Sequence, residues 1–243
     1  MNIHAIGDLA NRNAVDALEA ALVQQCLNEA TAQGASPSTP GQSSQQSHNS
    51  IEARAACQSR HRFRIEHAQI INPDDQKRIL SLGIIPSIQP THATSDMKYA
   101  QSRLGKDRTS SSAYRMRSLL PARPILGSDF PVEPPNPFQG IYAAVARRSP
   151  HTGRGTEESP DGWHTDEALS LDEAMWGFTG APAYGAFLDG RAGVIREGAL
   201  ADWVVLDKPI ESYNVEELRT LRVKETWVAG KRVYTRPHDE EAR

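Results

Sequence analysis

The sequence is poor in several features that would each have indicated a class of protein. Its 243 residues include only two cysteines, Cys26 and Cys57, which are too few for a disulfide framework. We interpret both as ordinary thiols that form no metal-binding pair, in a reducing, cytoplasmic location. The net charge is −3, so no excess of basic residues favours binding to nucleic acid or to an anionic membrane.

Long hydrophobic runs are also missing. No run approaches the roughly 18 residues that a membrane-spanning helix requires. Met1 is followed by Asn-Ile-His-Ala, which has neither the charged nor the apolar region of a signal peptide. Hydrophobic residues make up 38% of the chain, and the shortfall is concentrated in a few polar stretches. The other segments can therefore form a buried core.

The first sixty residues divide into a periodic and a polar segment. Between Gly7 and Gln33, apolar residues recur at steps of three and four, which predicts an amphipathic helix. Residues 34–59 are rich in Ser, Gln, Pro and Gly up to about Ser50. Such a composition cannot bury enough apolar surface to offset its ordering entropy. We therefore predict a disordered surface insertion over 34–59.

Strands and helices are then expected to alternate. The segments 62–67, 84–89 and 124–128 have the composition of short buried strands. Asn72-Pro73 predicts the start of a helix that ends at Gly83. Ser170 to Glu173 matches a capping box, which predicts a helix reaching about residue 187. Alternation of this kind indicates an α/β fold with a parallel sheet and functional residues at the C-terminal ends of its strands.

The pattern changes after residue 190. Residues 201–206 are strand-like, and 223–234 resemble a hairpin that turns at Gly230-Lys231. These strands stand apart from the β/α alternation. We therefore predict a β/α region over 1–190 and a second, all-β module over 191–243.

Three places in the sequence combine a short strand-like segment, its C-terminal end and a good metal ligand. His4 lies in Ile3 to Asp8, His67 in RIEHAQ, and Asp129 in LGSDFP. Two imidazoles and a carboxylate suit a borderline divalent ion such as zinc. A carboxylate ligand also keeps one oxygen for the proton of an activated water.

Each of these residues also has an ordinary structural interpretation. A single histidine is more often a hydrogen-bonded structural residue than a ligand, and Asp129 before Phe-Pro could simply start a turn. His92 and Asp96, which follow the strand IIPSIQ, either face a substrate pocket or belong to an ordinary loop with an aspartate cap. The residues alone leave these alternatives open.

Five motifs occur in one order along the chain: HAIGD, RIEHAQ, QPTHATSD, GSDFPVEPPNPFQGIYAAVAR and GVIREGALADWVVLD. Together they resemble the YtcJ-like branch of the amidohydrolase superfamily (amidohydrolase family 3), which includes N-substituted formamide deformylases. The resemblance covers nearly the whole chain outside the insertion. It implies the C-terminal half of a (β/α)8 TIM-type barrel, plus part of a small β-sandwich module over 191–243.

The resemblance also implies roles for individual residues. His4 and His67 would be metal ligands after strands five and six, and Asp129 would be ligand and catalytic base after strand eight. His92 and Asp96 would face the substrate. The complete enzyme would use a divalent metal, by expectation zinc, and activated water to hydrolyse non-peptide C–N bonds of the amide or formamide type. Its partner would be a small-molecule substrate, with no nucleic acid or membrane, and homo-oligomerisation stays open.

The sequence departs from this family in one respect. Relatives carry a His-x-His pair after the first barrel strand and usually a carboxylated lysine near the fourth, and no His-x-His occurs here. We therefore expect the C-terminal portion of such an enzyme, with weak or no metal binding by the isolated chain. The alternative is a truncated, catalytically inactive remnant or a binding-only fragment.

Overall fold

The structure is a computed structural model that describes residues 1–32 and 50–237. The chain divides into two compact units. The first contains Met1–Ile88 and Tyr99–Ile125, and the second contains Gln89–Lys98 and Leu126–Arg243. These two units do not correspond to the predicted β/α region over 1–190 and β module over 191–243. That boundary near residue 190 stays a prediction. Within the described residues, no helix is long and apolar enough to cross a membrane.

The first unit is built around a sheet with the strand order β1-β2-β3-β4. Its elements are β1 (Asn2–Ala5), α1 (Asp8–Ala32), α3 (Ile51–His61), β2 (Arg64–His67), α4 (Pro73–Leu82), β3 (Ile85–Ile88), α6 (Lys106–Ser112) and β4 (Ile125–Leu126). β1 pairs with β2 and β2 with β3, both in parallel. The predicted α/β class with a parallel sheet is confirmed, whereas the half-barrel and the sandwich stay predictions.

The sequence signals for α1 and α4 are confirmed. Val15, Leu18 and Leu22 of α1 are fully buried, so the predicted apolar face is the one that packs. The Asn72 side chain accepts a hydrogen bond from the backbone of α4, and Gly83 ends that helix with φ of 70°. A left-handed conformation of this kind favours glycine because it has no Cβ.

The predicted insertion over 34–59 is wrong in its last third. Ile51–His61 forms α3, whose first turn is capped by the Ser50 hydroxyl accepting from the Ala53 amide. Residues 33–49 lie outside the described part of the chain. The prediction failed because Ala53, Ala55 and Ala56 favour a helix while their polar neighbours continue the composition of the preceding stretch.

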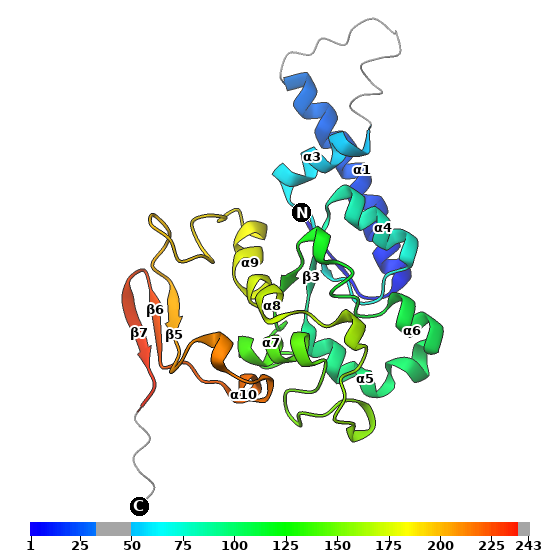
Figure 1. Ribbon diagram of the computed structural model, residues 1–243. Helices are drawn as coiled ribbons and strands as arrows, with labels where there is room; N and C mark the ends of the chain where they lie inside the picture. Colours follow the sequence, from blue (N-terminus) through cyan, green and yellow to red (C-terminus); the bar gives the residue numbers. More distant parts are fainter. Residues whose placement is uncertain (33–49, 238–243) are drawn as a thin grey trace, which may run out of the picture. The chain divides into compact units, whose positions relative to one another are not determined.

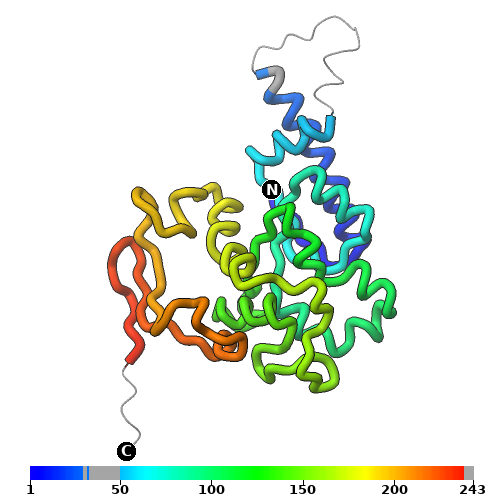
Figure 2. The backbone as a smooth tube through the Cα atoms, viewed as in Figure 1, coloured from blue at the N-terminus to red at the C-terminus, as the bar shows by residue number. Residues whose placement is uncertain are grey.

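The second unit combines helices with a small antiparallel sheet (Figures 1 and 2). Its elements are the start of α5 (Pro90–Leu104), α7 (Pro137–Ala146), α8 (Leu171–Phe178), α9 (Gly180–Gly185), β5 (Trp203–Val205), α10 (Val215–Thr220), β6 (Glu225–Val228) and β7 (Lys231–Thr235). α5 enters the first unit from Tyr99 onward. β6 lies between β5 and β7, so the predicted antiparallel hairpin is confirmed.

Local capping signals in the second unit are also confirmed. Ser170 and Glu173 form a reciprocal capping box at the start of α8. That helix ends at Phe178 rather than near 187, because Thr179 leaves helical geometry before α9 begins at Gly180. The β6–β7 turn lies at Ala229-Gly230, where both residues have positive φ, one position earlier than predicted.

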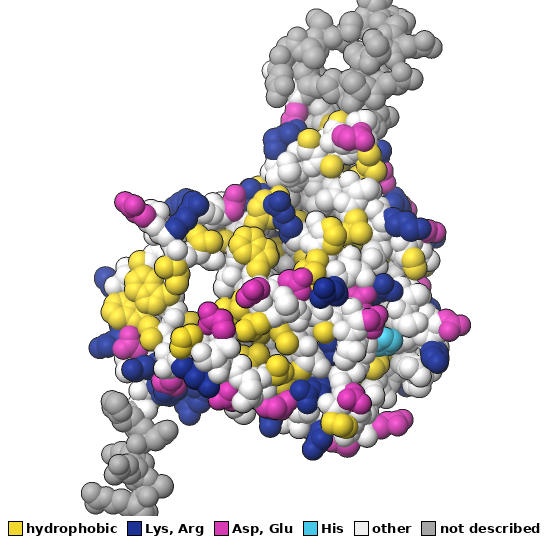
Figure 3. Space-filling view, viewed as in Figure 1, with side chains coloured by type: hydrophobic (Ala, Val, Ile, Leu, Met, Phe, Trp, Pro, Cys, Tyr) yellow, Lys and Arg dark blue, Asp and Glu magenta, His cyan; other side chains and the backbone are white. Residues whose placement is uncertain are grey.

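The β5–β6–β7 sheet carries apolar side chains at its surface. Trp203 of β5 and Trp227 of β6 stack with ring centroids 5.6 Å apart. Hydrophobic side chains gather over this sheet in the space-filling view (Figure 3), and the exposed ones include Val204, Val228 and Val233. Exposed apolar side chains therefore remain on this small sheet within its own unit.

Asn11 connects the loops that follow β1 and β2. Its fully buried side-chain amide donates to the carbonyl oxygens of Ile6, Gly7 and Ile70 at 3.0–3.1 Å. These carbonyls lie at the carboxyl ends of the two paired strands. The Asn11 side chain therefore holds together the two loops that form this edge of the sheet.

Asn11→Ala is expected to lower the free energy of unfolding by about 1–3 kcal/mol, because it removes three buried hydrogen bonds and leaves the Ile70 carbonyl without its side-chain donor. Urea denaturation followed by circular dichroism measures the change. Asn13→Ala, at an exposed position of the same helix, is the matched control and should leave stability nearly unchanged. Equal stability of both variants would show that the Asn11 amide does not hold these loops.

Candidate metal centre

His4 and His67 come together in the first unit. His4 lies in β1 and His67 is the last residue of β2, and the parallel register pairs Ala5 with His67. The two imidazole rings have centroids 4.3 Å apart at an interplanar angle of 70°. His67 is 7% exposed, whereas His4 is open to solvent. The two histidines that the sequence singled out therefore share one edge of the sheet.

The backbone at the end of β2 is strained. His67 and Ala68 have φ values of 74° and 46°, in the left-handed region that non-glycine residues rarely adopt. The Ala68 amide nevertheless donates to the Ala5 carbonyl, and the Ile70 amide donates to the Ile6 carbonyl. Strain of this kind persists only where surrounding contacts impose it, and it is common at functional sites.

His92 and Asp129 come together in the second unit. His92 lies in the first turn of α5, and its Nε2 is 3.9 Å from Oδ2 of Asp129 in the turn after β4. The His92 side chain is 10% exposed and the Asp129 side chain 39%. Asp129 also has a positive φ, of 59°. The carboxylate is therefore held beside a buried imidazole while one side of it stays open.

Asp96 is one helical turn beyond His92 on α5. Residues four apart lie on the same face of a helix, so both belong to one surface of α5. Both are helical, which excludes the alternative that they form an ordinary loop. Asp96 is half-buried, and its role in substrate binding stays a prediction.

Sequence reasoning missed a second link between α5 and the turn after β4. The Ser95 hydroxyl donates to Oε1 of Glu133 at 2.6 Å. The Phe130 amide donates to the Ser128 hydroxyl at 3.3 Å, within the same turn. Nothing in the local sequence connects Ser95 with Glu133, because the pairing depends on how α5 packs against that turn. These contacts hold the two segments that carry His92 and Asp129.

The donor set fits a divalent ion. Ligand atoms about 2.0–2.2 Å from a tetrahedral zinc ion lie roughly 3.2–3.5 Å from one another. The His92–Asp129 separation of 3.9 Å is too long for a hydrogen bond, so the carboxylate is not engaged by that imidazole. Imidazole and carboxylate groups are the ligands that catalytic zinc sites use. The residues at both strand ends therefore have suitable chemistry for such an ion.

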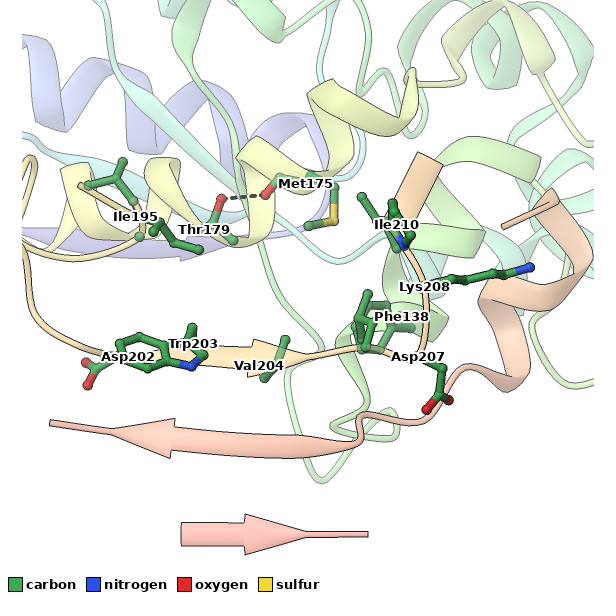
Figure 4. A pocket seen from close by; sticks show the side chains of 14 residues that line it. Phe138, Met175, Thr179, Ile195, Asp202, Trp203, Val204, Asp207, Lys208 and Ile210 are labelled. Carbon is green, nitrogen blue, oxygen red and sulfur yellow. Dashed lines mark hydrogen bonds between the residues drawn. The ribbon is translucent and has the colours of Figure 1, made fainter. Parts of the chain in front are cut away.

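A separate cavity of the second unit has a different character (Figure 4). Its volume is about 690 Å³, and Met175, Ile195, Trp203 and Val204 contribute its mainly apolar lining. The Thr179 hydroxyl on its wall donates to the Met175 carbonyl. The lining contains no histidine, so we do not assign metal chemistry to this cavity.

The fold has a counterpart among solved structures. An uncharacterized metal-dependent hydrolase from Pyrococcus furiosus superposes with a TM-score of 0.53 at 23% sequence identity. The match covers 82% of this chain and 31% of that protein. The likeness concerns the fold.

The sequence identifies the family. Residues 1–234 match the model of the amidohydrolase family, and the chain belongs to that family. The chain is 32% identical over 189 residues to the putative amidohydrolase YtcJ of Bacillus subtilis (strain 168), covering 76% of this chain and 34% of YtcJ. It is 31% identical over 176 residues to an N-substituted formamide deformylase of Arthrobacter pascens, covering 72% and 31%.

A third relative is Protein LONG AFTER FAR-RED 3 of Arabidopsis thaliana, which is 34% identical over 175 residues, covering 71% of this chain and 29% of the relative. The chain thus spans about a third of the length of these curated relatives. The resemblance noted from the motifs is confirmed. Family membership supports an enzyme.

Backbone strain at Asp129 leads to a prediction about stability. Asp129→Ala removes the carboxylate and keeps a Cβ at a left-handed position, whereas Asp129→Gly removes both. The free energy of unfolding of the glycine variant should exceed that of the alanine variant by about 0.5–1 kcal/mol. This difference already includes the greater conformational entropy that glycine has in the unfolded chain. Urea denaturation of the pair decides this. A more stable alanine variant would mean that the turn carries no strain.

Proposed function

We propose that this chain contributes His4, His67 and Asp129 to a metal centre that hydrolyses non-peptide C–N bonds. Two pairs of side chains near the ends of successive strands support the proposal. The His4 and His67 rings lie 4.3 Å apart, and His92 lies 3.9 Å from Asp129. Strained backbone at His67 and Asp129 supports a role beyond packing.

The proposed reaction is amide or formamide hydrolysis with zinc as the ion. When bound, a divalent ion supplies Lewis acidity, which lowers the pKa of water and polarises a carbonyl. An oxygen of the Asp129 carboxylate accepts the proton that the attacking water loses, and later returns it to the nitrogen of the departing amine. The water oxygen forms the new bond to the carbonyl carbon, and the C–N bond breaks.

His92 and Asp96 are proposed to contact the substrate. His92 Nε2 lies close enough to Asp129 for both side chains to reach one substrate group. The first turn of α5 is buried over Thr91 to Thr94, so packing restricts the position of the His92 side chain. A rigid imidazole can orient a substrate carbonyl for attack, which is the geometric requirement of this chemistry.

The formamide class is supported by the relative from Arthrobacter pascens, which is named for deformylation of N-substituted formamides. The hydrolysis of such a substrate yields formate and an amine. Both products can be measured separately, so a formate-release assay with an N-substituted formamide is a direct probe of the proposed bond cleavage.

Asp129→Asn is expected to lower kcat about a hundredfold, as loss of general acid–base catalysis commonly does. The measurement is formate release by the chain in a large excess of zinc, since weak metal binding is expected of it. Asp161→Asn, an exposed aspartate in a loop, is the matched control and should keep its turnover. Near-normal turnover by Asp129→Asn would remove this residue from the mechanism, and no turnover by the unaltered chain would favour the remnant or binding-only alternative.

A further inference from the structure

A second group of metal-ligating side chains lies in the first unit, between α1 and α3. Cys57 and His61 are four residues apart on α3, and Cys26 and Glu29 are three apart on α1. Residues at these spacings share one face of a helix, so each helix presents a ready pair of ligands. The two helices lie side by side (Figure 1).

The atoms of this cluster are close together. Ligand atoms of Glu29, Cys57 and His61 lie within 4.8 Å of one another. The Cys57 sulfur is 3.9 Å from Oε2 of Glu29, and Nε2 of His61 is 2.8 Å from Oε1 of the same carboxylate. Cys26, one turn earlier on α1, interacts with the Cys57 thiol. Three potential ligands from two helices therefore meet at one point, and a fourth lies beside one of them.

We propose that Cys26, Glu29, Cys57 and His61 bind a divalent ion such as zinc at a site separate from the hydrolytic centre. Two thiolates, an imidazole and a carboxylate are ligands that zinc takes in tetrahedral geometry. Zinc–sulfur bonds of about 2.3 Å and zinc–nitrogen bonds of about 2.0–2.1 Å put ligand atoms roughly 3.3–3.8 Å apart. Small side-chain shifts therefore suffice for Glu29, Cys57 and His61, whereas the Cys26 thiol must turn toward them.

Burial distinguishes this cluster from a group of exposed ligands. Cys57 is fully buried and Cys26 is 7% exposed, whereas the Glu29 and His61 side chains are each 29% exposed. The thiols thus form the inner side of the site, and the carboxylate and imidazole form its outer side. An ion can enter from the Glu29 and His61 side without opening the helix pair.

The competing interpretation is a purely structural ion pair. Glu29 accepts hydrogen bonds from Arg60 and His61, and its pKa is lowered mainly by the Arg60 guanidinium. Burial raises the pKa of Cys57 to about 12 when no ion is present, so binding must displace the thiol protons. Arg60 is half-exposed on the outer side and can swing into solvent when an ion neutralises Glu29.

The ion would connect two segments that are far apart in sequence. α1 ends at Ala32 and α3 begins at Ile51, so ligands on both helices would close the chain across the residues between them. A cross-link that closes a loop reduces the entropy of the unfolded chain. The proposed role is therefore structural, because the ion would hold α3 against α1. α1 is the helix that comes directly after β1, the strand that carries His4.

Cobalt titration of the reduced chain tests the proposal with a spectroscopic signature of sulfur ligation. One equivalent of Co²⁺ should produce a thiolate-to-cobalt charge-transfer band and tetrahedral visible absorption, both abolished by Zn²⁺. The proposed hydrolytic ligands include no sulfur, so failure of one site is distinguishable from failure of the other. A reduced chain without the charge-transfer band would overturn the proposal.

Variants assign the ligands. Cys26→Ser and His61→Gln should each weaken cobalt binding at least about tenfold, and they affect less buried positions than Cys57. His151→Gln, an exposed histidine in the second unit, is the matched control. His4→Gln should leave the charge-transfer band unchanged. A band that survives Cys26→Ser together with Cys57→Ser would contradict the assignment.

Thermal unfolding provides a second readout. Free Zn²⁺ at about a hundredfold excess over its Kd should raise the Tm by roughly 5–10 °C, since only the folded chain presents the site. The comparison is made in a His4→Gln background, which removes a ligand of the proposed hydrolytic centre, and there Glu29→Gln should abolish the zinc-dependent rise. If the cluster were only an ion pair, Glu29→Gln would lower the Tm by the same amount with and without zinc, and the proposal would fail.

Discussion

The parallel pairing of β1 with β2 is the constraint on which the candidate centre depends. The register runs from Asn2 opposite Arg64 to Ala5 opposite His67, with Ile3 beside the fully buried Ile65. A slip of one residue would turn every side chain of β1 to the other face of the sheet. The burial of Ile65 therefore fixes where His4 stands relative to His67.

Hydrogen bonds between the loops that follow β1 and β2 then position the ends of these strands. Hydrogen bonds from Ala68 and Ile70 to the residues that end β1 continue the pairing past the strands, and Asn11 fills the space between these loops. Because these contacts over-determine the backbone, His67 can keep a left-handed conformation. The strain that accompanies the candidate ligands is thus supported by neutral, buried hydrogen bonds.

Features of the fold that depend on a few neighbouring residues could be predicted from the sequence. The start of α4 at Asn72-Pro73, its end at Gly83 and the capping box of α8 each follow from local hydrogen bonding or from one backbone angle. The beginning of α5 at Pro90 was missed. Its first turn is buried, and tertiary packing there outweighs the loop-like composition of the segment.

Features that arise from packing between distant segments could not be predicted. His4, His67 and Asp129 were selected as individual residues after strands, but the proximity of His92 to Asp129 required the placement of α5. The two cysteines looked like ordinary thiols because 30 intervening positions hide their proximity, which only the packing of α1 against α3 reveals. Helical spacing of Cys57 and His61 was the one local signal available for that cluster.

The central claim is that one divalent ion is shared by His4, His67 and Asp129. Crystallography of the chain soaked in a large excess of zinc, which fills even a weak site, tests it most directly by anomalous scattering at the zinc edge. The account predicts an anomalous peak within bonding distance of both imidazoles and of the Asp129 carboxylate. A zinc-loaded crystal in which these three side chains face different directions, with no peak among them, would contradict it.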